Sequence, residues 1–334
     1  MSKSDKTALV TGANSGLGFE AAAQLADDGW GRVILACRSV KKGEAARTQL
    51  VERTGKDPFT VLAIDTSEVA SAAAAAEELR ERGEQIDFLL LNAGASGKDA
   101  SFNSDGVETT YASTLVGHHV LTMSALDHGL LTPRVRIVIA GSEGARGDLP
   151  GMSVHDIEKM ADESFGGDRV AAIDALVRIK APEQKKFVNM NEYVTAKLIV
   201  AWWVAALSRK LPKGMTVNAV SPGSNLSTSF GRDAPTAMRL IMMPMMKLLG
   251  PMMGMNGSID KGARRYLDAA EYADGDTGHF YATAKRRKLV GPIGIQTRPD
   301  YFTDHASQEA AFDALVALTG VGLPLIPKPK PTAE

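Results

Sequence analysis

Tyr193 and Lys197 are the residues whose types and spacing most directly suggest chemistry. They begin and end the segment Tyr193-Val-Thr-Ala-Lys197, and on a helix a spacing of four places two side chains on the same side, one turn apart. A phenol has a pKa of about 10 and is a weak base near neutral pH, but a lysine cation beside it favours the phenolate. Such a pair can exchange a proton with the oxygen of a carbonyl or an alcohol. The same spacing often arises by chance, so the alternative is an ordinary half-buried tyrosine.

A glycine-rich loop near the N-terminus is the second chemical feature. A short apolar strand pattern ends at Gly12, and a helical pattern follows Gly16 and Gly18. Glycines permit the tight turn and let backbone N–H groups approach a pyrophosphate, which then lies at the helix N-terminus. By itself such a loop is equally compatible with a turn that holds no ligand. In the cofactor-binding interpretation, the loop residues are Gly12, Asn14, Ser15, Gly16, Leu17 and Gly18.

Four motifs together resemble the short-chain dehydrogenase/reductase family. The loop has the narrow spacing T-G-x-x-x-G-x-G, Tyr193 and Lys197 have the form Y-x-x-x-K, residues 91–94 read L-N-A-G, and Ser142 ends a strand pattern. The resemblance covers roughly residues 6–230. The segments TGANSGLG, ACR, LNAG and GHH are more similar to the retinol dehydrogenase and protochlorophyllide reductase branch than to the polyketide reductases.

The resemblance implies a catalytic set for hydride transfer between a nicotinamide and a carbonyl or alcohol carbon. Tyr193 is the expected acid/base, Lys197 also bonds the nicotinamide ribose, and Ser142 bonds the substrate oxygen as charge develops on it. Each such group is commonly worth about two to four powers of ten in rate. The family usually has an asparagine in the helix after the fourth strand, which completes a proton relay through water. That position reads Thr114 here, so the relay is in doubt while hydride transfer is not.

The end of the second predicted strand indicates NADP(H) as the cofactor. In this fold an acidic residue there binds the 2′-hydroxyl of NAD, whereas an arginine accommodates the 2′-phosphate of NADP. The strand ends Ala-Cys37-Arg38-Ser39, with no acid. Arg38 offers a planar fork suited to phosphate and Ser39 adds a hydroxyl, although a solvated surface arginine is the alternative. Cys37 is expected to be a buried packing thiol.

The family match assigns further residues to the cofactor. The segments concerned end the third, fourth and sixth predicted strands, where polar residues could also be simple caps and turns. Asp65 and Thr66 correspond to the adenine contact, Asn92, Ala93 and Gly94 to the ribose side, and Pro222, Gly223, Ser227 and Thr228 to the segment that holds the carboxamide.

The elements that must position these groups alternate between short apolar strands and longer helices. Each strand pattern is buried and ends in a turn-forming or polar residue, as is typical of a parallel sheet. The alternation predicts an α/β protein of the Rossmann type, a doubly wound parallel sheet with helices on both faces, whose ligand lies at the carboxyl ends of the strands. The expected strands are residues 7–12, 32–38, 60–65, 86–94, 135–142 and 215–223, and the expected helices include 17–28, 41–54 and 67–83.

We expect a single domain over residues 1–334, with a core of about 6–230. Residues 143–190 separate the fifth strand from the next helix by far more than a short loop requires, so we interpret them as an insertion. The tail at about 323–334 is rich in proline and lysine and is expected to be a poorly ordered end.

A methionine-rich segment gives the best indication of the substrate. Residues 238–255 hold eight of the chain's 14 methionines, within a predicted substrate lid at about 229–260. Methionine is flexible and polarizable, so the segment favours a bulky apolar ketone, aldehyde or secondary alcohol as substrate. A core or interface helix and shallow membrane contact are the alternatives.

Composition excludes several other classes of protein. Hydrophobic residues make up 44% and charged residues 23% of the 334 residues, as in a globular protein, and a net charge of −1 gives no reason to expect nucleic acid as a partner. No transmembrane segment is predicted, because the apolar stretch 198–207 is about half the length of a bilayer span. A single cysteine and the absence of an apolar signal segment favour the cytoplasm. None of the six histidines forms a metal-binding pattern, so no metal is expected, and His118 and His119 are interpreted as packing and surface residues.

The helix that carries the catalytic pair continues as LIVAWWVAALSRK, residues 198–210, which is apolar on more than one face. A helix of this kind is usually buried, and members of the family often pair through it. We therefore predict a homodimer or a homotetramer.

The leading hypothesis is thus an enzyme acting on an apolar carbonyl or alcohol. An NADP(H)-binding regulatory protein with little turnover is the alternative. Thr114 and the insertion 143–190 favour the regulator, whereas the intact set of Ser142, Tyr193 and Lys197 favours the enzyme.

Overall fold

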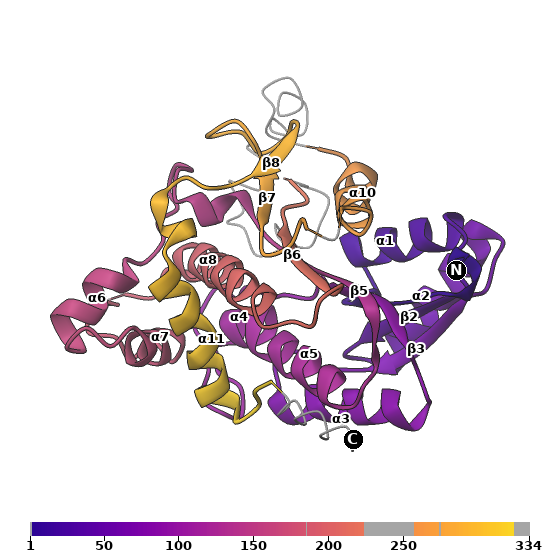
Figure 1. Ribbon diagram of the computed structural model, residues 1–334, viewed down its shortest axis with the longest axis horizontal. Helices are drawn as coiled ribbons and strands as arrows, with labels where there is room; N and C mark the ends of the chain where they lie inside the picture. The colour runs from indigo at the N-terminus through magenta and orange to yellow at the C-terminus, as the bar shows by residue number, and fades with distance from the viewer. Residues whose placement is uncertain (1, 185, 224–256, 274, 324–334) are drawn as a thin grey trace, which may run out of the picture.

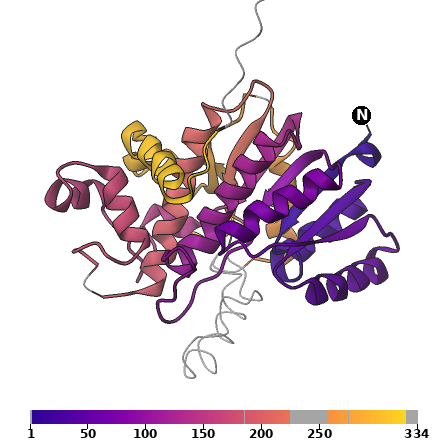
Figure 2. The same ribbon diagram turned by 90° about the horizontal axis from the view of Figure 1, so that it is seen from below.

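One eight-stranded sheet organises the structure, a computed structural model that describes residues 2–184, 186–223, 257–273 and 275–323. Helices cover both faces of the sheet (Figures 1 and 2). The strand order is β3-β2-β1-β4-β5-β6-β7-β8, and β8 alone runs antiparallel to its neighbour among these eight described strands. The predicted doubly wound parallel sheet is confirmed. The strands are β1 (Thr7–Thr11), β2 (Arg32–Cys37), β3 (Phe59–Ala63), β4 (Ile86–Leu91), β5 (Leu131–Ala140), β6 (Thr216–Val220), β7 (Phe280–Thr283) and β8 (Ile293–Ile295).

Strand β1 shows why the sheet needs helices on both sides. Its successive residues Ala8, Leu9 and Val10 point to opposite faces, yet all three are fully buried. Ala8 and Val10 belong to the core on one face, together with side chains of α1 (Gly16–Asp27), α2 (Val40–Thr54) and α10 (Ile259–Ala269). Leu9 belongs to the core on the other face. That face is covered by α3 (Val69–Glu81), α5 (Gly117–Asp127) and α8 (Asn189–Ser208), with α11 (His305–Thr319) packed on α8.

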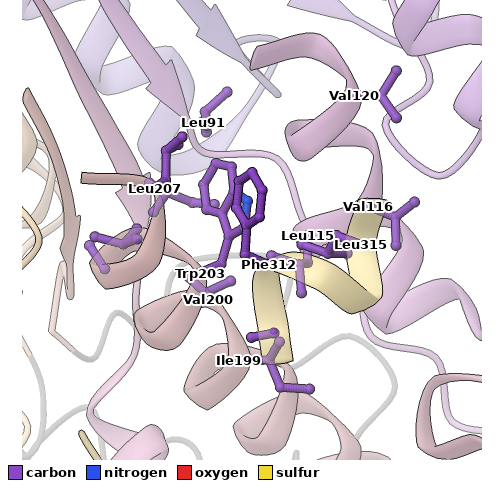
Figure 3. Close-up of a cluster of buried hydrophobic side chains, with 14 of the residues drawn as sticks. Leu91, Leu115, Val116, Val120, Ile199, Val200, Trp203, Leu207, Phe312 and Leu315 are labelled. Atoms are coloured by element: carbon purple, nitrogen blue, oxygen red, sulfur yellow. The ribbon is translucent and has the colours of Figure 1, made fainter. Parts of the chain in front are cut away.

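Helix α11 buries the apolar surface of α8 within the same chain. Trp203 of α8 is fully buried, and Phe312 and Leu315 of α11 are nearly so. Figure 3 shows these side chains packed together between the two helices. The Trp202 indole nitrogen also donates a hydrogen bond of 2.6 Å to the Tyr301 carbonyl, which connects α8 to the segment that precedes α11. The apolar character of α8 is therefore satisfied without a second subunit.

The segment predicted as an insertion contains defined helices. A short 3₁₀ turn, η3 (Glu143–Arg146), is followed by α6 (Ile157–Ser164) and α7 (Arg169–Val177). Aspartates cap both helices, because Asp156 accepts from the Lys159 N–H and Asp168 from two N–H groups of α7. In Figure 1 both helices lie at the end of the molecule away from β3, and α7 packs on α11. The remaining described elements are η1 (Lys3–Asp5), α4 (Thr109–Tyr111), the π-helical turn η2 (Ala112–Val116) and η6 (Asp300–Thr303).

Candidate functional site

The loop between β1 and α1 has the shape that a pyrophosphate requires. Gly12 and Gly16 have φ angles of +68° and +60°, which glycine adopts without strain. A Cβ on Gly18 would lie 2.6 Å from both the Gly12 carbonyl oxygen and the Asn92 side chain, so only glycine fits. Ser15 stands at the N-cap of α1 without a side-chain hydrogen bond, and the first N–H groups of the helix point to this loop. Asn14, Leu17 and Gly16 are half-buried around it.

Asn92 supports this loop from the end of β4. Its side-chain N–H donates to the Thr11 carbonyl at 3.0 Å, so the amide is used within the protein. The Thr11 hydroxyl oxygen accepts from the backbone N–H groups of Asn92 and Ala93 at 2.9 and 3.0 Å. Ala93 is half-buried and Gly94 is exposed next to them. The predicted ribose contacts of these three residues remain predictions, and the structure adds a role for Asn92 in shaping the loop.

His118 links the same loop to the helix after β4. The Thr114 carbonyl can only accept a hydrogen bond, so His118 Nδ1 carries the ring proton and donates it to that carbonyl at 3.0 Å. His118 Nε2 then accepts from the Thr11 hydroxyl, which lies 3.0 Å from it and 3.4 Å from the Leu90 carbonyl. Burial lowers the pKa of His118 to about 3. The imidazole is therefore neutral at physiological pH and has a fixed tautomer.

His119 corrects the expectation that one histidine of the pair would lie at the surface. Both His118 and His119 are fully buried. His119 Nε2 donates to the Val321 carbonyl at 2.8 Å, and Nδ1 accepts from the Trp203 indole N–H at 3.1 Å. Burial lowers the pKa of His119 to about 4. No local pattern could indicate these partners, because Val321 lies 202 residues away from His119 in the chain.

Arg38 lies where the sequence analysis placed the cofactor-selecting residue. It follows β2, its side chain is 78% exposed, and its Nε is 3.9 Å from an oxygen of Asp65 at the end of β3. The other oxygen of Asp65 accepts from the backbone and the hydroxyl of Ser67. Ser39 caps α2 by accepting from the Lys42 N–H at 3.3 Å. Buried Cys37 confirms the packing interpretation, and burial raises the pKa of its thiol to about 11.

Thr66 sits against the helix after β4 and fixes how closely that helix approaches β3. A Cβ on Gly117 would lie 2.1 Å from the Thr66 carbonyl oxygen, so glycine is required at this contact. Thr66 itself is buried. The close approach holds Thr66 against the first residue of α5, and its predicted adenine contact stays a prediction.

Ser142, Tyr193 and Lys197 come together at the carboxyl ends of the central strands. Ser142 follows β5, caps η3 and accepts from the Gly144 N–H at 3.2 Å. Its hydroxyl is hydrogen-bonded to the Tyr193 phenol. Lys197 Nζ lies 5.8 Å from the centre of the Tyr193 ring and donates to the Ala140 carbonyl at 2.6 Å. The spacing of four on α8 thus brings the phenol and the amine to one side of the helix, as predicted.

Burial dominates the acid–base properties of this group. It raises the pKa of the Tyr193 phenol, while the bond with Ser142 lowers it and the charge of Glu143 raises it. Burial also lowers the pKa of Lys197 to about 7. The phenol is therefore protonated at neutral pH and can act as a proton donor, and the amine sits near the midpoint of its titration.

Thr114 lies in the π-helical turn η2 between α4 and α5. Such turns are frequent at functional sites. Its backbone carbonyl accepts from His118, and its hydroxyl oxygen is buried without a hydrogen-bond partner among the described residues. A Cβ on Gly94 would lie 3.2 Å from that oxygen. An unpaired buried hydroxyl is unfavourable unless a water or ligand completes it.

Known proteins resemble the chain over the segment that carries the glycine loop and Ser142. Residues 6–165 match the family described as short chain dehydrogenase. The short chain dehydrogenase atnD of Emericella nidulans is 30% identical over 293 residues, which cover 83% of each chain. The chain belongs to the short-chain dehydrogenase family.

Further relatives place this short-chain dehydrogenase within the family. The WW domain-containing oxidoreductase of Gallus gallus is 29% identical over 231 residues, 69% of this chain and 51% of that protein, so the chain spans about half the length of that relative. Retinol dehydrogenase 12 of Mus musculus is 30% identical over 223 residues, 66% of this chain and 62% of that protein. These likenesses confirm the predicted retinol dehydrogenase branch.

A solved structure agrees with the fold. A short chain dehydrogenase from Burkholderia cenocepacia, in complex with NADP, superposes with a TM-score of 0.57 at 21% identity. The match covers 82% of this chain and 94% of that one. At this identity the likeness supports the fold alone.

Ser221, Pro222 and Gly223 form a turn after β6 that the structure ties to groups missed by the sequence analysis. Gly223 has a φ of +77°, and its N–H donates to the Ser221 hydroxyl at 3.3 Å. The missed residues are Glu143 of η3 and Arg265 of α10, both of which contact Ser221. The sequence could suggest an acid beside Ser142, but it could not indicate the partners of that acid.

Several predicted features lie outside the described residues. They are Ser227, Thr228, the methionines of 238–255, the lid up to residue 256 and the tail from 324.

A cavity of 640 Å³ lies beside Arg146, the last residue of η3. Ser142, Tyr193 and Lys197 are not among the described residues that line it. Its lining mixes apolar and charged side chains of both signs, among them Leu149, Val154, Asp148, Arg286 and Arg287.

Within the described ranges, no group of histidine, cysteine and acidic side chains is arranged to hold a metal ion. The helices of those same ranges include none that is long and apolar enough to cross a membrane.

Proposed function

We propose that this short-chain dehydrogenase is an NADP(H)-dependent oxidoreductase. It moves a hydride between the nicotinamide and the carbonyl or alcohol carbon of an apolar ketone, aldehyde or secondary alcohol. The observation that carries the proposal is the hydrogen bond between the Ser142 and Tyr193 hydroxyls beside the buried amine of Lys197. Such an arrangement supplies a proton donor and a cation at one point, as carbonyl reduction requires.

The residues around the β1–α1 loop fit the cofactor. The cradle at Gly18 has no room for a side chain, which suits a pyrophosphate bound by backbone N–H groups. Arg38 is exposed and its Asp65 partner is at the limit of an ion pair, so its fork is available to the 2′-phosphate that distinguishes NADP. When bound, NADP(H) donates or accepts the hydride. The phosphate side would be completed by Gly12, Asn14, Ser15, Gly16 and Leu17. The adenosine side would be formed by Ser39, Asp65 and Thr66, and the ribose side by Asn92, Ala93 and Gly94. The nicotinamide carboxamide would be held by Pro222, Gly223, Ser227 and Thr228.

The side chains of the chain itself carry out the proton transfer to the substrate oxygen. Tyr193, whose pKa burial raises, donates its proton to the substrate oxygen during reduction. Ser142 bonds the same oxygen as negative charge develops on it. Lys197, once protonated, would stabilise the phenolate left on Tyr193. A water bonded to the unpaired hydroxyl of Thr114 would resupply the proton.

The substrate class rests on the sequence. The methionine-rich residues 238–255 follow the segment that corresponds to the carboxamide contact, where adaptable apolar side chains suit a bulky apolar substrate. We keep an apolar ketone, aldehyde or secondary alcohol as the proposed class.

Turnover of apolar ketones by the purified protein with NADPH tests the proposal. Tyr193→Phe should lower turnover by about two or more powers of ten, while its affinity for NADPH stays unchanged because the ring and Lys197 remain. Tyr272→Phe, a half-buried tyrosine outside the site, is the matched control and should retain full activity. NADPH binding without turnover of any ketone or alcohol would favour the regulatory protein instead.

A homodimer or homotetramer in the cytoplasm stays a prediction. Its main argument is weakened, because α11 covers the apolar surface of α8 within one chain. Light scattering at micromolar concentration decides the assembly, and a monomer mass would overturn the prediction.

A further inference from the structure

Glu143 is a buried carboxylate placed directly after Ser142. It is 3% exposed and lies in the single turn of η3. Removing a carboxylate from water is unfavourable unless hydrogen bonds and an opposite charge compensate for it. The partners that compensate Glu143 therefore identify the segments whose positions depend on it.

Those partners come from the ends of two other strands and from a helix. The Ser221 hydroxyl, after β6, donates a hydrogen bond to Glu143 Oε2. Thr283, at the end of β7, donates to Oε1 from its backbone N–H at 3.2 Å and from its hydroxyl at 3.0 Å. Arg265 of α10 lies 3.6 Å from the same oxygen. One carboxylate thus joins the carboxyl ends of β5, β6 and β7.

Arg265 extends the connection to the same turn. Its Nη1 donates to the Ser221 carbonyl at 3.2 Å and its Nη2 to the Gly291 carbonyl at 2.7 Å. The Ser221 hydroxyl has a single proton, which goes to Glu143, while its oxygen accepts from the Gly223 N–H at 3.3 Å. The turn of Ser221, Pro222 and Gly223 is therefore held through Glu143 at its side chain and through Arg265 at its backbone.

We propose that Glu143 is a positioning residue whose carboxylate holds the Ser221–Pro222–Gly223 turn in place for the nicotinamide end of the cofactor. The inference rests on the proposed function and goes beyond it, since neither the sequence motifs nor the catalytic set includes Glu143. A carboxylate suits this position because it accepts several hydrogen bonds at once and pairs with Arg265.

The same carboxylate acts on Tyr193 through its charge. Its negative charge raises the pKa of the Tyr193 phenol, after the larger effect of burial. Among the described residues, the other titratable groups around the phenol are Lys197 on α8 and Tyr266 on α10. Beyond them, Arg265 pairs with Glu143 and His118 lies close to Lys197. Loss of the Glu143 charge should therefore lower the pKa of Tyr193.

Glu143→Gln tests both effects while keeping the size of the side chain. We expect its dissociation constant for NADPH, measured by fluorescence titration without substrate, to rise about tenfold. We also expect the falling limb of the pH profile for ketone reduction to move to lower pH, because the phenol loses its proton at lower pH. The KM for NADPH should rise more than kcat falls at the pH optimum.

Two further variants separate positioning from general destabilisation. Ser221→Ala removes the link to the turn but keeps the charge, so it should weaken NADPH binding and leave the pH profile unchanged. Glu84→Gln removes another buried carboxylate, which forms an ion pair with Arg32 at 2.6 Å. Glu84 precedes β4 and therefore lies at the amino ends of the strands, away from the site. This variant should change neither NADPH affinity nor the pH profile.

The NADPH affinity and the pH profile of these variants support or overturn the proposal. If Glu143→Gln folds and binds NADPH as the parent does, with the same pH profile, the proposal is wrong. If Glu143→Gln does not fold, Ser221→Ala decides alone: unchanged NADPH affinity would overturn the proposal and weaker affinity would support it. Failure of the proposed function would appear earlier, as a parent protein that does not bind NADPH.

Discussion

Lys197 donates a hydrogen bond from its Nζ to the carbonyl oxygen of Ala140, 2.6 Å away at the end of β5. Lys197 is 4% exposed, and burial lowers the pKa of its amine to about 7. In the unfolded chain the lysine pKa is about 10.4. Between these two values the unfolded chain holds a proton that the folded chain lacks, so stability should rise with pH in this window.

We predict that Lys197→Met removes this pH dependence. From pH 7.5 to 9 the parent should gain up to about 1.4 kcal/mol of unfolding free energy per pH unit relative to the variant, measured by urea denaturation. Lys213→Met, on an exposed residue before β6, is the control and should keep the parent's slope. Parallel curves for the parent and Lys197→Met would show that the amine is protonated in the folded protein.

Arg38 carries the second prediction. Because its fork is largely exposed and only loosely paired with Asp65, it can bind the 2′-phosphate. We expect NADPH to bind at least about tenfold more tightly than NADH, which corresponds to about 1.4 kcal/mol, and Arg38→Asp to abolish the preference. Lys213→Asp makes the same change in charge before the amino end of β6 and should preserve the preference for NADPH. Equal dissociation constants for the two cofactors in the parent would contradict the prediction.

The sequence could predict the sheet because each central strand is an apolar run that ends in a polar or glycine residue. Strands β1 to β6 lie where the runs indicated, and the carboxyl ends of parallel strands meet at one edge, which brings Arg38 close to Asp65 and Ser142 close to Tyr193. Strands β7 and β8 have four and three residues, too few to show a pattern.

What the sequence could not predict are pairings between distant segments. Glu143 is hydrogen-bonded to Ser221 and Thr283, which lie 78 and 140 residues away in the chain. No local sequence pattern indicates partners at such distances. The apolar surface of α8 was correctly expected to be buried, but the sequence could not say that α11 would bury it. The placement of Ser142, Tyr193 and Lys197 agrees with the motif, whereas their catalytic roles stay predictions.

His119 gives a prediction about acid stability. Because burial lowers its pKa to about 4, the unfolded chain takes up a proton below pH 6.5 that the folded chain does not, and stability should fall as the pH falls. His119→Gln keeps an acceptor for the Trp203 N–H and a donor for the Val321 carbonyl without titrating. Between pH 6 and 4.5 it should lose up to about 1.4 kcal/mol less per pH unit than the parent. His305→Gln, at the exposed start of α11, controls for the loss of an imidazole, and an unchanged slope in His119→Gln would contradict the prediction.

The last prediction concerns the proton relay at Thr114. Its buried hydroxyl has no partner among the described residues, and its carbonyl is already engaged by His118. A water bonded to that hydroxyl would satisfy it and could pass a proton toward Lys197. We expect Thr114→Val, which keeps the shape but removes the hydroxyl, to lower turnover about tenfold.

Thr114→Asn distinguishes a relay from simple packing. The asparagine restores the side chain that the family usually has, so its maximal rate should stay within about tenfold of the parent while the pH dependence of turnover changes. NADPH affinity should not change in either variant, because Thr11 and the glycine loop remain intact. If the hydroxyl holds no water, Thr114→Val removes only an unpaired polar group and should be more stable than the parent by about 1–3 kcal/mol at equal turnover. That combination, measured by urea denaturation and steady-state kinetics, would show that protons reach Tyr193 by another route.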